Sequence, residues 1–185
     1  MSFNLPKYKS LKELRQNDPT WKQFLTKDPR SANKICEDQF LICGDDIILT
    51  PLDEEFNKVA HKLLQHTLMG ELTDDINGIH MISKFNPSIK NAFEVRNEDK
   101  NGVWIATIEY YSGKRNKTFT KQESTMFPKK WCASTYMFEI CFAYHNKKRK
   151  SPESEYHISH TSSGVPVEFV IKNGNLKTVY PIYQE

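Results

Sequence analysis

Two histidines and a pair of hydroxyl-bearing residues are the side chains of this chain best suited to proton-transfer chemistry. His66 lies in the segment HTLMGE and His80 in the segment NGIHMI, while Thr178 and Tyr180 lie close together far downstream. Histidine exchanges a proton near neutral pH, so two histidines can supply a general base and a general acid. Lysines would add the positive charge that stabilises an anionic transition state. These residue types suffice for an acid–base reaction, and the sequence shows no cluster of metal ligands.

The C-terminal segment places Thr178 and Tyr180 on one strand of a predicted hairpin. Asn173-Gly174 separates two apolar-alternating runs, a pattern typical of a two-residue type I′ turn. The period of two along the second strand puts four residues on one face, namely Leu176, Thr178, Tyr180 and Ile182. Pro181 limits further pairing at the end of that strand.

A helix after Thr50-Pro51 is expected to carry His66. Thr50 suits the N-cap, Pro51 suits the first helical position, and Gly70 is a natural stop. Residues at a spacing of 3.6 form one apolar face: Phe56, Val59, Ala60, Leu63, Leu64 and Thr67. His66 falls at the edge of this face and His61 points away from it, so His66 is the histidine placed to reach a cleft.

The remaining elements predict an α+β fold. Residues 78–87 read as a loop or short strand that carries His80 and Lys84, and residues 103–111 read as a strand that turns at 112–114 and returns from 117. A helix from about 133 to 146 is apolar over most of its surface and is therefore expected to be buried. The polar residues 151–164 predict a mobile loop. Residues 1–50, with short helical signals at 11–15 and 21–25, predict an N-terminal helical extension to a domain at 51–185.

Composition permits a packed domain with a polyanionic partner. The chain has 185 residues, a formal charge of +3 and basic residues concentrated between 114 and 150. No apolar run approaches the roughly 20 residues of a membrane span, and the N-terminus lacks the apolar core of a signal peptide. A soluble, not conventionally secreted protein is therefore expected. The cysteines show no zinc spacing and are expected to be free thiols: Cys36, Cys43, Cys132 and Cys141.

Four separated segments together resemble the EndoU endoribonuclease family, whose bacterial members include contact-dependent toxins. The first segment is similar to the family's H-x-x-x-G-E, the second to its G-x-H, the third to its lysine, S-T-F-F-P and tryptophan before an apolar helix, and the fourth to its closing T-x-Y-P. In this chain they are residues 66–71, 78–80, 121–131 and 177–181. Asn77-Gly78-Ile79 stands where the family often has a glycine pair. The long stretch between His80 and Lys121 suggests an insertion compared with compact bacterial members.

The resemblance implies a role for each matching residue. His80 would be the general base and His66 the general acid, acting on the 2′-hydroxyl and the 5′-oxygen of RNA. Lys121 would stabilise the developing charge by its position before Ser124, and Lys84, which is closer to His80 in the sequence, is the alternative and otherwise a substrate contact. The remaining expected substrate contacts are two hydrogen-bonding hydroxyls and a stacking ring: Ser124, Thr178 and Tyr180.

The implied function is a nuclease that cleaves single-stranded RNA or tRNA, leaning toward uridylate, and leaves a 2′,3′-cyclic phosphate and a 5′-hydroxyl. The implied fold has two small antiparallel sheets enclosing a cleft, as in RNase A-like catalytic folds. No cofactor is expected, although manganese stimulates some members; neither DNA nor a membrane is expected as a partner. A toxin with a dedicated inhibitor protein is one implied role, acting in the cytoplasm or after delivery into a target cell. The alternatives are a non-catalytic RNA-binding module of the same fold and a protein–protein interaction domain.

Overall fold

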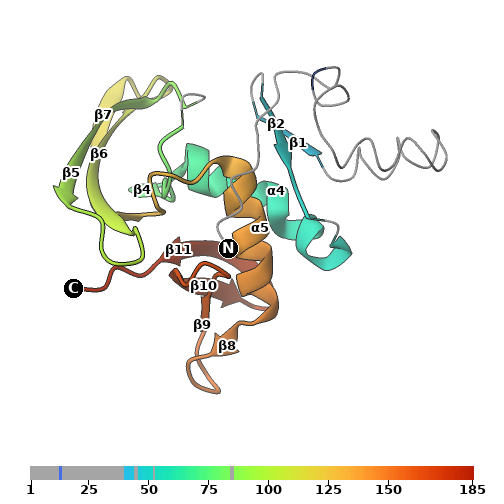
Figure 1. Ribbon diagram of the computed structural model, residues 1–185. Coiled ribbons are helices and arrows are strands. Elements are labelled where there is room, and N and C mark those ends of the chain that lie inside the picture. Colours follow the sequence, from blue (N-terminus) through green and yellow to red (C-terminus); the bar gives the residue numbers. More distant parts are fainter. Residues whose placement is uncertain (1–12, 14–39, 44–45, 52, 84–85) are drawn as a thin grey trace.

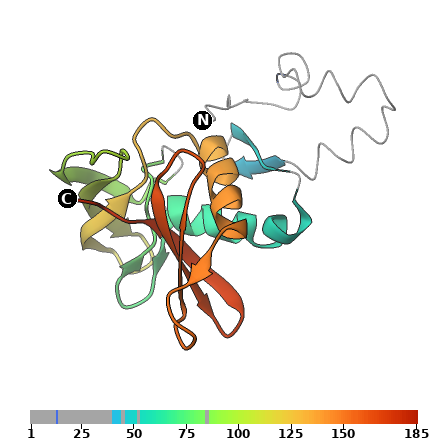
Figure 2. The ribbon, with the colours of Figure 1, turned by 60° about the horizontal axis from the view of Figure 1, so that its bottom comes forward.

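The computed structural model describes residues 13, 40–43, 46–51, 53–83 and 86–185. The fold is α+β, as predicted, with two long helices in this part of the chain, α4 (Glu54–Met69) and α5 (Ala133–His145). Figures 1 and 2 show two antiparallel sheets that lie side by side, with α5 packed next to the C-terminal sheet. None of the described helices is long and apolar enough to cross a membrane.

The two larger sheets are built from consecutive antiparallel strands. The first has the order β5-β6-β7, with β5 (Ile89–Arg96), β6 (Trp104–Ser112) and β7 (Lys117–Met126). The second has the order β11-β10-β9-β8, with β8 (Lys148–Arg149), β9 (Tyr156–His160), β10 (Pro166–Lys172) and β11 (Asn175–Pro181). Strand β11 contacts β7, so the two sheets meet along these strands. A short hairpin of β3 (Glu71–Leu72) and β4 (Ile76–Asn77) follows α4.

The segment before α4 includes a β-hairpin. Strands β1 (Phe40–Cys43) and β2 (Asp46–Leu49) pair antiparallel, and Ile48 is buried in the main core. This part of the predicted N-terminal extension is therefore extended, not helical, and it packs on the domain through α5. The helical signals at 11–15 and 21–25 lie outside the described residues, apart from Glu13, which is helical.

Helix α4 begins later than predicted. Asp53, not Thr50, is the N-cap, and its Oδ1 accepts a hydrogen bond of 2.7 Å from the backbone N–H of Phe56. Aspartate is as good an N-cap as threonine, and Asp53 stands directly before the acidic first turn. Gly70 ends the helix as predicted, with a positive φ of 68° that favours glycine. His66 is half-buried and His61 is exposed, which confirms their predicted positions relative to the apolar face.

The main core lies between α4, α5 and the C-terminal sheet. Helix α5 is buried around most of its circumference, as its sequence predicts. The core contains large residues from all three elements, among them Phe56, Leu63, Tyr136, Ile140 and Phe169. A buried hydrogen bond of 2.8 Å between Thr67 Oγ1 and the Tyr136 hydroxyl ties α4 to α5 one residue after His66. The position of His66 is therefore set by the core.

The C-terminal hairpin is confirmed, and the loop predicted at 151–164 is wrong in part. Asn173 and Gly174 have φ values of 51° and 72°, as a type I′ turn requires at both positions. Residues 156–160 form strand β9, which pairs with β10 along five residues. Pairing with a buried neighbouring strand overrides their polar composition, because the ladder satisfies the backbone N–H and C=O groups whatever the side chains are.

Candidate active site

A cleft of about 510 Å³ lies where the end of α4, the loop before His80, β7 and β11 converge. It gathers five residues that the sequence singled out: His66, His80, Lys121, Thr178 and Tyr180. Three charged residues that line the same cleft were not predicted as site residues: Lys62, Glu71 and Lys177. Lys84, the alternative catalytic lysine, lies outside the described residues. The four sequence segments thus converge on one cleft although they are far apart along the chain.

The end of α4 holds the loop that carries His80. The carbonyl of His66 accepts hydrogen bonds of 3.1 Å from the N–H groups of both Gly70 and Ile79, and the N–H of His80 donates to Thr67 O at 2.9 Å. Gly78 makes this approach possible, because a Cβ on it would lie 2.2 Å from the carbonyl oxygen of His66. The backbone of one histidine therefore fixes the loop that presents the other.

Strand β7 and the residue that follows it hold the same loop from the opposite side. The Lys121 ammonium donates to Gly78 O, Ser124 Oγ donates to Ile79 O at 2.9 Å, and the N–H of Phe127 donates to His80 O at 2.8 Å. Ser124 is only 2% exposed and is absent from the cleft lining, so its observed contact is with the loop. Three residues of one segment thus clamp three consecutive carbonyl groups.

A β-bulge in β7 makes this clamp possible. Ala106 pairs with Ser124 and Ile108 pairs with Lys121, so β7 has one residue more than β6 between these pairs. In a regular strand Lys121 and Ser124, three positions apart, would point to opposite faces. The extra residue brings both side chains to the loop, and Glu123 takes the positive φ of 48° that the bulge imposes.

The hydrogen bond from its ring sets the tautomer of His80. Nδ1 lies 2.7 Å from the carbonyl oxygen of Thr125, which can only accept, so Nδ1 carries the proton. Nε2 is then the lone-pair nitrogen of a ring that lines the cleft. Burial, with the Lys121 charge as the next cause, lowers the pKa of His80 to about 3. His80 is therefore neutral at ordinary pH, and its Nε2 is a hydrogen-bond acceptor.

This low pKa predicts that stability falls with acidity. The unfolded chain takes up a proton on His80 near pH 6.5, whereas the folded chain does so near pH 3, so the unfolded state binds more protons between these values. The free energy of unfolding should fall as pH drops below 6.5, by up to about 1.4 kcal/mol per pH unit from this group. Urea unfolding at pH 7, 6 and 5 gives the free energy of unfolding at each pH. This free energy should depend less steeply on pH in His80→Gln than in the wild type and in His61→Gln. An equal pH dependence in all three proteins would contradict the prediction.

His66 has a more open environment. Burial lowers its pKa, the Glu71 carboxylate opposes this shift, and the Lys121 and Lys62 charges add to it. Burial also lowers the pKa of Lys121 to about 8, so its ammonium is charged at neutral pH. Because His66 is only half-buried and lies beside Glu71, it can exchange its proton with solvent and be charged when an anion binds.

Tyr180 and Thr178 line the side of the cleft formed by β11. The ring of Tyr180 lies 5.9 Å from that of His80, centroid to centroid, and its hydroxyl donates to Glu168, which also pairs with Lys150. Burial and this carboxylate raise the pKa of Tyr180. Among the described residues Thr178 Oγ1 has no hydrogen-bond partner. One hydroxyl is therefore committed to the protein, and the other is buried without a hydrogen bond among the described residues.

A second bulge explains why Lys177 was missed. Val170 pairs with Thr178 and Ile171 pairs with Leu176, which leaves Lys177 as an extra residue in β11. The strict alternation predicted for this strand is interrupted there, so Lys177 lines the cleft together with Thr178 while Leu176 packs in the core. Lys62 could have been found from the sequence, since it lies one helical turn before His66.

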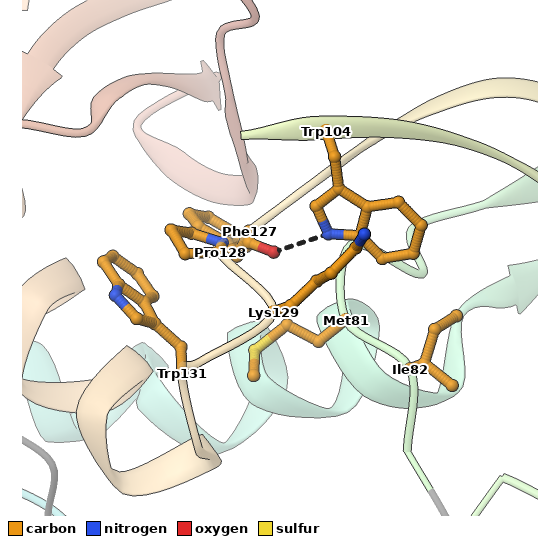
Figure 3. A pocket seen from close by; sticks show the side chains of 7 residues that line it. All are labelled: Met81, Ile82, Trp104, Phe127, Pro128, Lys129 and Trp131. Carbon is orange, nitrogen blue, oxygen red and sulfur yellow. Dashed lines mark hydrogen bonds between the residues drawn. The ribbon is translucent and has the colours of Figure 1, made fainter. Parts of the chain in front are cut away.

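An apolar pocket of about 270 Å³ lies on the other side of the His80 segment, and aromatic residues form much of its lining (Figure 3). Trp104 Nε1 donates to Phe127 O at 3.0 Å, and the Trp131 ring stacks on Phe127 at 5.4 Å. Trp131 is 6% exposed and belongs to the main core. Met81 follows His80 directly and lines this pocket, so the loop that carries His80 rests on a packed aromatic layer.

One group of potential metal ligands is found among the described residues, and it lies outside the cleft. Side-chain donors of Asp53, Cys141 and His145 lie within 4.8 Å of one another. His145 Nε2 contacts Asp53 Oδ2 at 2.7 Å, and burial, followed by the Asp53 charge, raises the pKa of the Cys141 thiol to about 12. The Cys141 thiol is therefore protonated, and Cys141 is a free buried cysteine, as predicted. Asp53 is held at this position as the N-cap of α4, which accounts for its carboxylate lying beside His145.

The comparison with protein families agrees with the geometry of the cleft. The family described as "Bacterial EndoU nuclease" matches residues 60–183, a range that contains both histidines, Lys121, Thr178 and Tyr180. No curated protein and no solved structure matches the chain. The match covers most of the chain and both sheets that form the cleft. The chain therefore belongs to the bacterial EndoU nuclease family.

Proposed function

We propose that the protein is a metal-independent endoribonuclease that cleaves single-stranded RNA by transesterification. The observation that carries the proposal is the fixed tautomer of His80, whose Nδ1 faces Thr125 O and whose ring lines the same cleft as His66 and Lys121. A neutral imidazole with a free Nε2, a second imidazole and an ammonium are the three groups that this reaction needs. Membership of a nuclease family supports the assignment.

In the proposed reaction His80 Nε2 removes the proton of the ribose 2′-hydroxyl. The 2′-oxygen attacks the adjacent phosphorus, and the negative charge that accumulates on the non-bridging oxygens is stabilised by the Lys121 ammonium. The bond from phosphorus to the 5′-oxygen then breaks, and protonated His66 gives its proton to that oxygen. The products are a 2′,3′-cyclic phosphate on one fragment and a 5′-hydroxyl on the other.

The side of the cleft formed by β11 is proposed to bind the nucleotide whose 2′-hydroxyl reacts. Tyr180 offers a ring held in place through Glu168, and Thr178 lines the cleft with a hydroxyl that is buried and has no partner among the described residues. A ring stacks on an unpaired base, which favours single-stranded RNA or a tRNA loop, and a single hydroxyl can discriminate a base edge. The family resemblance favours uridylate at this position. A toxin held in check by an inhibitor protein is the biological role that this activity fits, in the cytoplasm or in a target cell.

Removing the Tyr180 ring should weaken substrate binding. Stacking of a base on an aromatic side chain contributes about 1–3 kcal/mol, so Tyr180→Ala should raise KM by roughly 5- to 150-fold. Tyr180→Phe keeps the ring and loses only the contact with Glu168, so its KM should stay close to that of the wild type. Steady-state kinetics on a short uridine-containing RNA measures KM for both variants. Equal increases in KM would show that the hydroxyl of Tyr180, and not its ring, contributes to substrate binding.

Product analysis tests the proposed reaction directly. Purified protein incubated in EDTA with a uridine-containing single-stranded RNA should give a cyclic phosphate, identified by mass, and the same RNA with 2′-deoxyuridine at the cleaved position should be resistant. A 3′-monophosphate formed without a cyclic intermediate, or cleavage of the deoxy-substituted strand, would contradict the mechanism. Salt-sensitive binding of RNA with no product would favour the non-catalytic module of the same fold.

A further inference from the structure

A second hollow, of about 260 Å³, adjoins the catalytic cleft along α4 and β11. Its lining consists of lysines, apolar side chains and the hairpin turn: Lys58, Val59, Lys62, Tyr144, Ile171, Gly174, Asn175, Leu176 and Lys177. Lys62 and Lys177 line both this hollow and the catalytic cleft. The two spaces are therefore neighbours across one pair of lysines, and α4 and β11 are in contact along this boundary (Figure 2).

The lysines of this hollow, Lys58, Lys62 and Lys177, are exposed. In the part of the chain that the structure describes, no carboxylate lies within ion-pair distance of Lys58, Lys62 or Lys177. Lys58 and Lys62 stand one turn apart on α4, a spacing at which like charges repel and weaken a helix. A bound anion would relieve this repulsion, so the hollow suits an anionic ligand.

The lysines of α4 form a row that ends at the catalytic acid. Lys58, Lys62 and His66 are spaced four residues apart, so they follow one line along the helix with Cβ atoms about 6 Å from their neighbours. Lys177 faces this row from β11, where the bulge turns it toward the cleft. A row of positive charges at nearly regular intervals, continuous with the reacting centre, suits the repeating phosphates of an extended strand.

We infer that Lys58, Lys62 and Lys177 bind the phosphates of the RNA strand on the 3′ side of the cleaved bond. The direction rests on the proposed function, in which His66 protonates the 5′-oxygen of the leaving nucleotide. The strand that continues beyond His66 is therefore the leaving, 3′ strand, and the row of lysines runs away from His66 on α4. Lysine binds phosphate as a point charge, so this site selects for strand length and not for base sequence.

Binding of a non-cleavable RNA tests this site without requiring catalysis. The probe is a fluorescent RNA with a single 2′-deoxyuridine at the reacting position, in a short form and with six nucleotides added on either the 3′ or the 5′ side. Anisotropy should show several-fold tighter binding of the 3′-extended probe than of the 5′-extended one. Lys58→Gln should remove most of this gain, whereas Lys58→Arg should retain it. Lys100→Gln, an equal charge change on an exposed residue outside both hollows, is the matched control.

Salt dependence gives a second readout. Each phosphate contact with a single strand contributes about 0.7 to the slope of log affinity against log salt, so Lys58→Gln should lower that slope by about 0.7 for the 3′-extended probe alone. Equal effects of Lys58→Gln and Lys100→Gln, or equal gains from 3′ and 5′ extension, would overturn the assignment. A protein that binds the 3′ extension through Lys58 and yet cleaves no RNA would uphold this site and refute the proposed reaction.

Discussion

Replacing His80 by alanine should lower kcat by about 10²- to 10⁴-fold, the range that a positioned general base contributes. The same loss is expected from His66→Ala when the substrate is an RNA, because the 5′-oxygen is a poor leaving group without a proton. Both variants should keep the fold, since neither ring contributes to the main core. Single-turnover cleavage of a uridine-containing RNA measures the loss, and circular dichroism checks the fold.

A substrate with an activated leaving group separates the two histidines. Uridine 3′-(4-nitrophenyl phosphate) releases nitrophenolate, which needs no proton at neutral pH, while its 2′-hydroxyl still needs a base. On this substrate His66→Ala should regain most of the wild-type rate and His80→Ala should not. Recovery by His80→Ala instead would exchange the two roles, and recovery by neither would assign both histidines to charge stabilisation.

Gly78→Ala should remove nearly all activity while a similar substitution elsewhere leaves it intact. A Cβ at Gly78 would lie 2.2 Å from the His66 carbonyl oxygen and 3.0 Å from the His66 ring, at a φ of +75°. The loop must then move away from α4, and a displacement of about 1 Å can cost 10²-fold in rate. Gly164→Ala meets no atom within 4 Å at a φ of +88°, so it carries only the backbone cost of about 1–2 kcal/mol.

Comparison of the two glycine variants distinguishes a site effect from a loss of stability. Thermal unfolding should show both variants destabilised, Gly78→Ala the more strongly, with kcat/KM reduced in Gly78→Ala alone. If Gly164→Ala lost activity to the same extent, the rate would be following global stability, and the contact between the loop and His66 would have no special part in catalysis.

Ile79 shows why this chain can depart from the glycine pair common in the family. It has a φ of 58°, which costs a residue with a branched Cβ about 1–2 kcal/mol. It is also fully buried in the smaller core beside Ile76, Trp104 and Ile108. Burial of an isoleucine contributes about 1.5–3 kcal/mol, enough to offset the backbone strain. The hydrophobic contact therefore replaces the conformational freedom of glycine at this position.

Local sequence signals predicted much of the fold because each had a local physical cause. Asn173-Gly174 adopts positive φ at low cost. The apolar face of α4 orients His66, and α5 is buried because its own surface is apolar. The convergence of His66, His80, Lys121 and the Thr178/Tyr180 pair on one cleft followed from the order of the motifs and not from any local rule. The helical character of residues 1–39 stays a prediction, apart from Glu13.

The elements that were missed depend on pairing between distant strands. The bulges at Glu123 and Lys177 arise from register with β6 and β10, which no window of either strand reveals. Strand β9 is polar and forms because β10 offers a free edge. Ser124 matches the family motif, yet its hydroxyl donates a hydrogen bond to Ile79 O. A motif identifies a residue but does not give the direction of its side chain.

The exposed turn between β8 and β9, residues 150–155, separates two sets of residues proposed to have different roles in the site. Every group proposed to move a proton or stabilise charge precedes it, and the pair proposed to hold the base follows it. A chain cut there would yield two pieces, each without activity, whose reunion is driven by core residues such as Phe169 and Val179 packing on α4 and α5. The protein could thus be produced as two inactive halves, and RNA cleavage after mixing would report their complementation.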